Sequence, residues 1–346
     1  SRLRSLSVAE KSGAIVVCQR GMALLLVVAM ISVLSAVVIR FNRTTSASME
    51  QVSAYKSDTV LSAMAESGIE IGLILLDSDR LQNDFDALSE PWALLEDQNL
   101  SPLFDQGELR VTIEDYSGRL PINRLVADSQ EDDPDDKPGT AAAFRRVLLR
   151  LLTSGEFAVA GDAQATEIVD SLTDWLDPDD TAQVNGAESA YYLSLPSPYI
   201  ARNGAVEFME ELLLVKGVTP EILYGNDEKK GLSEYIRLYG RGRININTAP
   251  RLLLQSLAEG VPAEAAETAD AYRRDASAAA ALMDPNWYRS LLGWPEDAVI
   301  EDGLVASSSA WFRIRASARQ QTGRMQMWAD LNRTGDGLVV MHRGTR

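Results

Sequence analysis

The sequence has very little of the two side chains on which much metal and acid–base chemistry depends. Its 346 residues include one Cys, Cys18, and one His, His342. A single Cys excludes a disulfide framework and any multi-cysteine metal site. A single His excludes two-histidine metal sites and argues against histidine-based catalysis. We therefore predict that the chain is not an enzyme.

Basic residues are also in deficit, with 33 Lys and Arg against 50 Asp and Glu and a formal net charge of −17. Phosphate binding needs clustered Lys and Arg, so we expect no nucleic acid partner. A hydrophobic content of 46% is that of a folded protein, which excludes global disorder. The length suits one large domain or two smaller ones.

One long apolar run without charge stands near the amino terminus, from Met22 to Ile39. Its eighteen residues span about 27 Å as a helix, just enough to cross the hydrocarbon core of a bilayer. A cleaved secretory signal has a shorter apolar core and a small-residue cleavage site, neither of which is found here. The leader, residues 1–21, carries a net charge of +3, so residues 22–346 carry −20. This bias predicts a single membrane span with the amino terminus inside.

The helical pattern continues beyond the apolar run. Residues 40–76 contain no Pro, and apolar residues such as Val52, Tyr55 and Met64 recur at nearly helical spacing. We predict one helix from about Met22 to about Leu76. Its first third crosses the membrane, and the rest is amphipathic and half buried against a folded domain.

Strand patterns stand at both ends of the remaining chain. Glu108–Asp115 alternates apolar and polar residues, as do Ala310–Ala318, Arg324–Leu331 and Leu338–His342. Gln320–Gly323 is typical of a hairpin turn between the first two of the later strands. Helical periodicity dominates the chain between them.

This order predicts an α+β fold, in which a long amino-terminal helix packs on a small antiparallel sheet and a large helical domain is inserted between strands. The expected divisions are a leader at 1–21, a transmembrane segment at 22–39, and the helix continuation with the first part of the sheet at 40–125. The inserted helical domain follows at 126–255. The rest of its packing and the final antiparallel strands occupy 256–346.

A short motif occurs twice in the chain. Gly118–Asn123 reads GRLPIN, and Gly242–Asn247 reads GRININ. Each copy precedes a helical pattern. The two copies indicate either a pseudo-repeat or two matched junctions that bracket an insertion.

The loop from Asp177 to Glu188 has the spacing of an EF-hand calcium loop, whose oxygen ligands include positions one, three, five, nine and twelve. Counted from Asp177, these positions hold Asp177, Asp179, Thr181, Asn185 and Glu188. Position six is Ala182, where an EF-hand has Gly for a sharp turn. The residues alone therefore leave a solvated acidic loop open as the alternative.

If a metal binds here, the favoured ligands are Asp177, Asp179 and Glu188, with Asp174 and Asp180 next. A second acidic run, Asp128–Gly139, is expected to be a solvated loop.

The amino terminus resembles a type IV prepilin, with a basic leader that ends in Gly21, an apolar stretch and an amphipathic continuation. The resemblance implies cleavage between Gly21 and Met22 by a prepilin peptidase and methylation of the new amino terminus. Most members have Glu at the fifth position after the cut, where this chain has Leu26. In lacking this Glu, the chain resembles the K-type minor pseudopilin of type II secretion systems. The lack suits a subunit that has no other subunit above it in the pilus.

Motifs along the rest of the chain are also similar to this K-type family, known as general secretion pathway protein K. They are GRLPINRL at 118–125, DWLDPDD at 174–180, GAE at 186–188, ELLLVKGV at 211–218 and INTAP at 246–250.

The resemblance implies a minor pseudopilin at the tip of the pseudopilus, where it primes and caps pilus assembly for protein export across the outer membrane. Expected partners are the I- and J-type minor pseudopilins, other pseudopilins and the prepilin peptidase. The expected location is the inner membrane, with the carboxy-terminal domain in the periplasm. Members bind structural Ca²⁺ in the helical domain, which favours Ca²⁺ at the acidic loop. The alternatives are a membrane-anchored extracytoplasmic binding protein or adhesin, and a minor pilin of a surface pilus.

Overall fold

The computed structural model describes residues 19–104, 107–127, 139–240, 242–320, 323–335 and 337–345. The chain divides into two compact units, Ser1–Val60 and Leu61–Arg346, which are described separately. The acidic run predicted as a solvated loop lies outside the described residues, except for Gly139.

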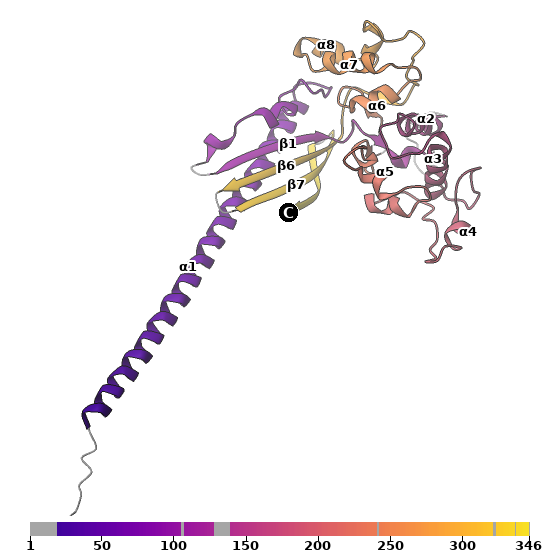
Figure 1. The fold of residues 1–346 in the computed structure, drawn as a ribbon. Coiled ribbons are helices and arrows are strands. Elements are labelled where there is room, and N and C mark those ends of the chain that lie inside the picture. Colours follow the sequence, from indigo (N-terminus) through magenta and orange to yellow (C-terminus); the bar gives the residue numbers. More distant parts are fainter. Residues whose placement is uncertain are drawn as a thin grey trace, which may run out of the picture. The chain divides into compact units, whose positions relative to one another are not determined.

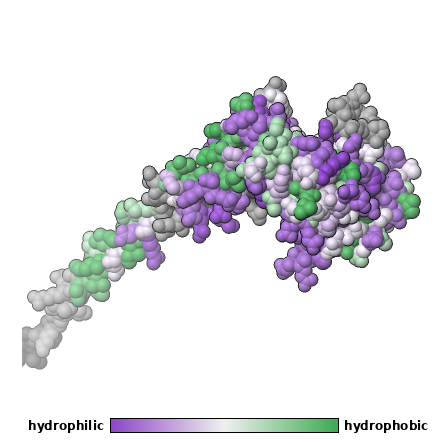
Figure 2. Space-filling view, turned by 90° about the horizontal axis from the view of Figure 1, so that it is seen from above, coloured by the Kyte–Doolittle hydropathy of each residue, from purple (hydrophilic) through white to green (hydrophobic). Residues whose placement is uncertain are grey.

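The described part of the first unit belongs to a single helix, α1, which runs from Gln19 to Arg80. Its stretch Leu24–Ser46 has a mean hydropathy of 2.6 and no buried side chain, and its length and composition suffice to cross a membrane. Figure 2 shows apolar residues along this stretch. Ser57–Arg80 passes the same length and composition test, but 39% of it is buried because α1 packs on the sheet there.

The second unit contains an antiparallel sheet in the order β1-β6-β7-β8 (Figure 1). Ile113 of β1 lies opposite Ile314 of β6, and the β6–β7 hairpin closes with Gln320 opposite Gly323. The strand bounds are β1 Glu108–Asp115, β6 Trp311–Gln320, β7 Gly323–Thr334 and β8 Gly337–Thr345.

Close packing joins α1 to one face of this sheet. The buried side chains of Leu61, Met64 and Leu76 contact the apolar residues of the strands. Two Gly residues allow the close approach. A Cβ added to Gly72 would lie 2.7 Å from Cδ1 of Ile314, and one added to Gly68 would lie 2.8 Å from Cβ of Ala316. The backbone of α1 therefore lies almost directly on β6 at these two positions.

The chain between β1 and β6 forms a helical domain with its own apolar core, separate from the core beneath α1 (Figure 1). Its α-helices are α2 Thr140–Leu152, α3 Asp162–Leu176, α4 Ser189–Tyr192, α5 Pro220–Tyr224, α6 Arg251–Ser256, α7 Ala263–Arg273 and α8 Ala279–Leu282. Two short parallel ladders pair β2 Leu120–Pro121 with β3 Ile236–Arg237, and β4 Ile244–Asn245 with β5 Val305–Ala306. Short 3₁₀ helices lie at Ala93–Asp97, Ser101–Leu103, Ile122–Arg124, Met209–Leu214, Leu232–Glu234, Ala276–Ala278 and Trp287–Ser290.

The observed architecture is the predicted α+β fold, with the helical domain inserted between the first and second strands of the sheet. Strand bounds differ from the sequence prediction by a few residues at the ends. Within the part of the chain where helical periodicity dominates, Met209–Leu214 forms a 3₁₀ helix rather than an α-helix.

The two copies of the short motif lie together near the point where the chain leaves β1, although the second copy lies within the helical domain, well before β6 begins at Trp311. The backbone N–H of Asn245 donates to the carbonyl of Ser117 at 2.9 Å. Gly118 lies so close to Thr248 that an added Cβ would be 2.6 Å from its hydroxyl. The two copies are therefore neighbours in space, and they bracket residues 124–241 of the helical domain rather than the whole insertion between β1 and β6.

Candidate metal centre

The candidate centre is built on the last turn of α3 and the loop that follows it. The apolar face of α3 is buried in the domain core, and Asp174 is carried inward with it at 0% exposure. The helix ends at Leu176, and the next residue, Asp177, has an extended backbone and precedes Pro178. A residue before Pro is disfavoured in the helical region, so the chain turns away there. The loop returns at Glu188, just before α4.

Three carboxylates meet at this point. One oxygen each from Asp174, Asp177 and Glu188 lies within 4.8 Å of the other two. The loop holds Asp174 through the backbone N–H of Gln183, which donates to its two oxygens at 3.0 and 3.1 Å. Gly186 is required for this approach, because an added Cβ would lie 1.9 Å from Oδ2 of Asp174.

Several oxygens at the centre are buried without any hydrogen-bond partner. They are Oδ1 of Asp177 and both carboxylate oxygens of Glu188. Oδ1 of Asn203, whose side chain contacts Asp179 and Asp180 of the same loop, is also unpartnered. Buried polar atoms are almost always hydrogen-bonded, and a buried charge is costly unless a group of opposite charge compensates it. Three unpartnered carboxylate oxygens within the cluster therefore indicate a site for a cation.

The raised pKa values of the three carboxyl groups also indicate a cation site. Burial, followed by the negative charges of Asp174 and Asp177, raises the pKa of Glu188 to about 7. Burial and the charges of Asp179 and Asp174 raise the pKa of Asp177 to about 6. Burial also raises the pKa of Asp174, although the N–H of Gln183 opposes this change. The cluster holds its negative charge at an energetic cost that a bound cation would remove.

The other loop residues singled out by spacing lie at the edge of the centre. Asp179 is exposed and accepts the backbone N–H of Thr181 at 2.7 Å. Asp180 accepts the side-chain amide of Asn203 at 3.2 Å. The side chain of Asn185, at position nine, donates to Asp170 at 2.9 Å instead.

Asn203 is the functional candidate that sequence reasoning missed. Its amide nitrogen donates to the carbonyl of Asp179 and the carboxylate of Asp180, while its oxygen has no partner. Its φ of 50° is rare outside Gly, and Asn tolerates it better than most residues. The only signal in the sequence was the Asn-Gly pair at 203–204, which is typical of a turn.

The donor set is chemically suited to a hard divalent ion. Carboxylate and amide oxygens are the ligands that Ca²⁺ takes, whereas zinc and copper sites use imidazole or thiolate groups. The residues present therefore fit Ca²⁺, with Asp174, Asp177 and Glu188 as the groups that would hold it and the unpartnered oxygen of Asn203 as a further candidate. Asp179 and Asp180 lie at the edge, and their charges add to the negative potential of the centre.

A second group of three buried carboxylates lies near the end of α1 and contains Asp79, Asp86 and Glu90. Here Arg333 supplies a cation. Its guanidinium lies 3.2 Å from Oδ2 of Asp79 and contacts Oδ2 of Asp86. Glu90 accepts the indole N–H of Trp92 at 3.0 Å. This group is an internal ion pair with a satisfied glutamate beside it.

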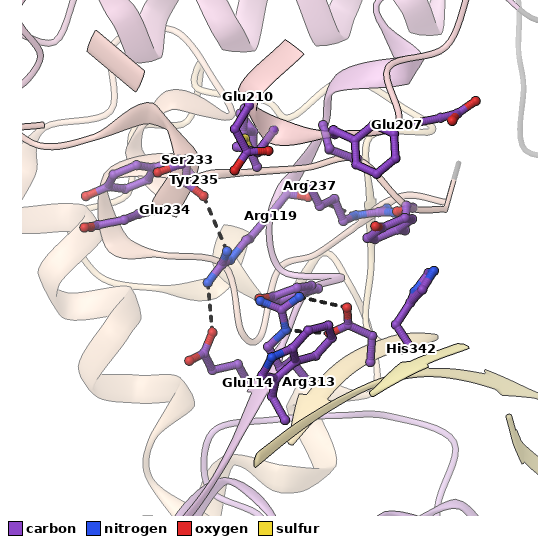
Figure 3. A pocket seen from close by; sticks show the side chains of 18 of the residues that line it. Glu114, Arg119, Glu207, Glu210, Ser233, Glu234, Tyr235, Arg237, Arg313 and His342 are labelled. Carbon is purple, nitrogen blue, oxygen red and sulfur yellow. Dashed lines mark hydrogen bonds and ion pairs between the residues drawn. The ribbon is translucent and has the colours of Figure 1, made fainter. Parts of the chain in front are cut away.

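A cleft of about 1010 Å³ lies between the helical domain and the sheet face opposite α1 (Figure 3). Arg119 crosses it, donating to the carboxylate of Glu114 at 3.1 Å and to the carbonyl of Ser233 at 3.4 Å. Arg313 is paired with Asp330. These charged side chains already have partners, and the bonds of Arg119 link the helical domain to the sheet across the cleft. The described residues of the cleft include no nucleophile–base pair.

The residues linked to processing lie in α1. Gly21 and Met22 fall within the helix, and Leu26 is 66% exposed on it.

Comparison with known proteins identifies related chains. Residues 118–224 match a family model described as "Type II secretion system (T2SS), protein K". A protein of that name from Pseudomonas aeruginosa is 35% identical over 193 residues, which are 55% of this chain and 51% of the relative. One from Aeromonas hydrophila is 32% identical over 124 residues, 34% of this chain and 35% of the relative. The match thus spans about half the length of the first relative and about a third of the length of the second.

A solved structure has the same fold. Its title is the GspK-GspI-GspJ complex from the type 2 secretion system of enterotoxigenic Escherichia coli. The matched chain has a TM-score of 0.63 and 18% identity, over 86% of this chain and 99% of that one. Together these matches confirm the resemblance to the K-type family that the sequence motifs predicted.

Proposed function

We propose that this chain, which carries the protein K match over residues 118–224, is a minor pseudopilin of a type II secretion system. The observation that supports this most directly is the joint occurrence of that match and the shared fold over 86% of the chain. The proposed role is structural, since pseudopilins are assembly subunits rather than catalysts. An adhesin or a surface pilin would share the membrane anchor but not the protein K match.

The proposed position is the tip of the pseudopilus, where the chain primes and caps assembly for export across the outer membrane. Two features support this. The helical domain inserted between β1 and β6 adds bulk beyond the sheet that would obstruct a subunit above it. Leu26 stands where most pilin-type chains have the Glu that pairs with a neighbouring amino terminus.

The amino terminus is proposed to anchor the chain in the inner membrane and to be processed there. Leu24–Ser46 has the length, hydropathy and complete exposure of a membrane span. The prepilin peptidase would cut between Gly21 and Met22, and the mature unit would extend into the periplasm. The I- and J-type minor pseudopilins are the proposed partners, by analogy with the GspK-GspI-GspJ complex.

The test is the mass and amino-terminal sequence of the full chain after co-expression with a prepilin peptidase. We expect a product that begins at N-methylated Met22 in the wild type. Gly21→Leu should block processing, whereas the matched leader change Gly13→Leu should leave it intact. An intact leader in the wild type would instead support a plain membrane anchor.

The candidate metal centre is proposed to bind one Ca²⁺ that stabilises the loop between α3 and α4. The three unpartnered carboxylate oxygens and the raised pKa values of Asp177 and Glu188 support this proposal. Bound Ca²⁺ would supply the positive charge that the cluster lacks. Asp174 and Asp177 would position the ion at the end of α3, and Glu188 would close the site from the other end of the loop.

Calorimetric titration of the full chain with Ca²⁺ tests this proposal. We expect Asp177→Asn/Glu188→Gln to lower the affinity at least 100-fold. The matched change Asp86→Asn, in the cluster that contains Arg333, should leave it unchanged. Equal binding by the wild type and the double variant would contradict the assignment.

A further inference from the structure

The two edges of the sheet differ in how they are covered. The edge strand β1 is covered by the 3₁₀ helices Ala93–Asp97 and Ser101–Leu103. The other edge strand, β8, pairs only with β7 among the described residues (Figure 1). A strand with one free edge presents a row of unpaired backbone N–H and C=O groups, which is a template for a further strand.

The free edge of β8 carries little of the usual protection against pairing. Proteins protect such edges with Lys, Pro, bulges or a covering segment. Leu338–Met341 reads LVVM, and Val339 and Met341 are 49% and 45% exposed. A bulge beside Met341 interrupts the register with β7, but Gly337–Val340 stays in regular pairing. Arg343, the charged residue that follows, is already paired with Glu70 at 3.6 Å.

Helix α1 overhangs this edge. The Glu70–Arg343 pair places one end of β8 beside α1, and Arg80 bonds the carbonyl of Gly335 just before β8 begins. Ile74 follows Glu70 by one turn, so it lies on the same face of α1, and it is 67% exposed. A strand added to β8 would lie about 4.8 Å beyond it, where an apolar side chain would contact Ile74.

We propose that the free edge of β8 docks an extended segment of a neighbouring minor pseudopilin, which joins the sheet as a fifth strand beneath Ile74. This inference rests on the proposed function, which supplies the neighbouring subunit. Hydrogen-bond complementarity makes the occupant an extended chain, because only an extended backbone matches the spacing of donors and acceptors along an edge. The exposed Val339, Met341 and Ile74 favour apolar side chains on both faces of that segment.

The test is amide hydrogen exchange of the full chain, alone and in complex with the I- and J-type subunits of the same secretion system. We expect the amides of 337–341 to exchange at least tenfold more slowly in the complex. Val339→Lys/Met341→Lys should weaken complex formation at least tenfold. Met283→Lys/Leu292→Lys, which changes two apolar residues of the helical domain that are at least as exposed, should not.

The outcomes separate this inference from the proposed function. A complex in which β8 exchanges as fast as in the free chain would overturn the docking edge and leave the partnership standing. Absence of any complex would overturn the partnership and the edge together. Concentration-dependent protection in the chain alone would assign the edge to a second copy instead. If the double Lys variant does not fold, the exchange of the wild-type chain still decides the matter.

Discussion

The molecule gathers three buried carboxylates in two places and neutralises them in different ways. In each cluster the oxygens lie within 4.8 Å of one another. The cluster of Asp79, Asp86 and Glu90 contains the guanidinium of Arg333, which pairs with two of its members. The cluster of Asp174, Asp177 and Glu188 contains no side-chain cation among the described residues and leaves Oδ1 of Asp177 and both oxygens of Glu188 unpartnered.

This difference separates an ion pair from a ligand site better than the number of acids does. Both clusters have raised pKa values, since burial raises the pKa of Asp86 to about 8 and that of Glu188 to about 7. A raised pKa alone therefore does not identify a metal site. The distinguishing features are the internal cation in one cluster, which has one unpartnered oxygen, Oδ1 of Asp86, and the three unpartnered carboxylate oxygens of Asp177 and Glu188 in the other.

Removing Arg333, the internal cation, is the most direct test of the difference between the two clusters. We expect Arg333→Gln to lower the free energy of unfolding by about 3–5 kcal/mol, because it leaves buried carboxylates uncompensated. Denaturant unfolding of the full chain in detergent measures this. The control is Arg274→Gln, whose half-exposed side chain pairs with Asp270 and whose loss should cost less than about 1 kcal/mol. Similar losses in the two variants would show that Arg333 does not compensate the first cluster.

The corresponding test for the second cluster, Asp174, Asp177 and Glu188, is to add Ca²⁺. At a Ca²⁺ concentration 100 times the dissociation constant, the wild-type chain should gain about 2.7 kcal/mol of stability relative to a chelator-treated sample. Thermal unfolding with and without chelator measures the gain. Glu188→Gln should lose most of it, whereas Asp86→Asn should keep it. A gain in Glu188→Gln as large as in the wild type would place the ion elsewhere.

The parts of the centre that sequence reasoning identified are those close together in the chain. Asp174 and Asp177 are three residues apart at the end of one helix, and Glu188 closes the loop that follows. Periodicity and spacing are sufficient for such local arrangements. The same holds for the strands, whose alternation identified β1, β6, β7 and β8 to within a few residues.

The parts that could not be predicted depend on distant segments meeting. Asn203 lies beyond α4 and contacts the loop only when the domain folds. Arg333 reaches Asp79 and Asp86 from β7, more than 240 residues away along the chain. Spacing also placed Asn185 at a ligand position, but a carboxylate outside the loop, Asp170, takes its side chain.

The pH dependence of stability in the absence of Ca²⁺ sharpens the comparison further. The pKa of Glu188 is about 7 in the folded chain against an ordinary value of 4.5, so the folded state binds more protons in this range. Its contribution to stability therefore falls as the pH rises from about 4.5 to about 7, by at most about 1.4 kcal/mol per pH unit. Above pH 7 it stays constant.

Unfolding of the wild type and of Glu188→Gln between pH 4.5 and 8, with a chelator present, isolates this contribution. The difference between the two curves should favour the variant increasingly up to about pH 7. Saturating Ca²⁺ should reverse the trend for the wild type, because the ion binds the ionised carboxylate. Parallel curves without Ca²⁺ would mean that Glu188 carries no unfavourable charge in the folded chain.

The smallest expected effect is a change in Ca²⁺ affinity when an Asn side chain is removed. It tests whether the spacing along the chain or the geometry of the fold identifies the additional ligand. Spacing assigns a ligand to Asn185, whereas the structure leaves the buried oxygen of Asn203, whose side chain contacts Asp179 and Asp180 of the same loop, without a partner. Asn203→Gly keeps the backbone at positive φ accessible and removes only the amide. We expect it to weaken Ca²⁺ binding severalfold, up to about tenfold, which corresponds to about 1.4 kcal/mol or less. Asn185→Gly should change calorimetric affinity less, and the reverse order would show that the EF-hand spacing governs the site.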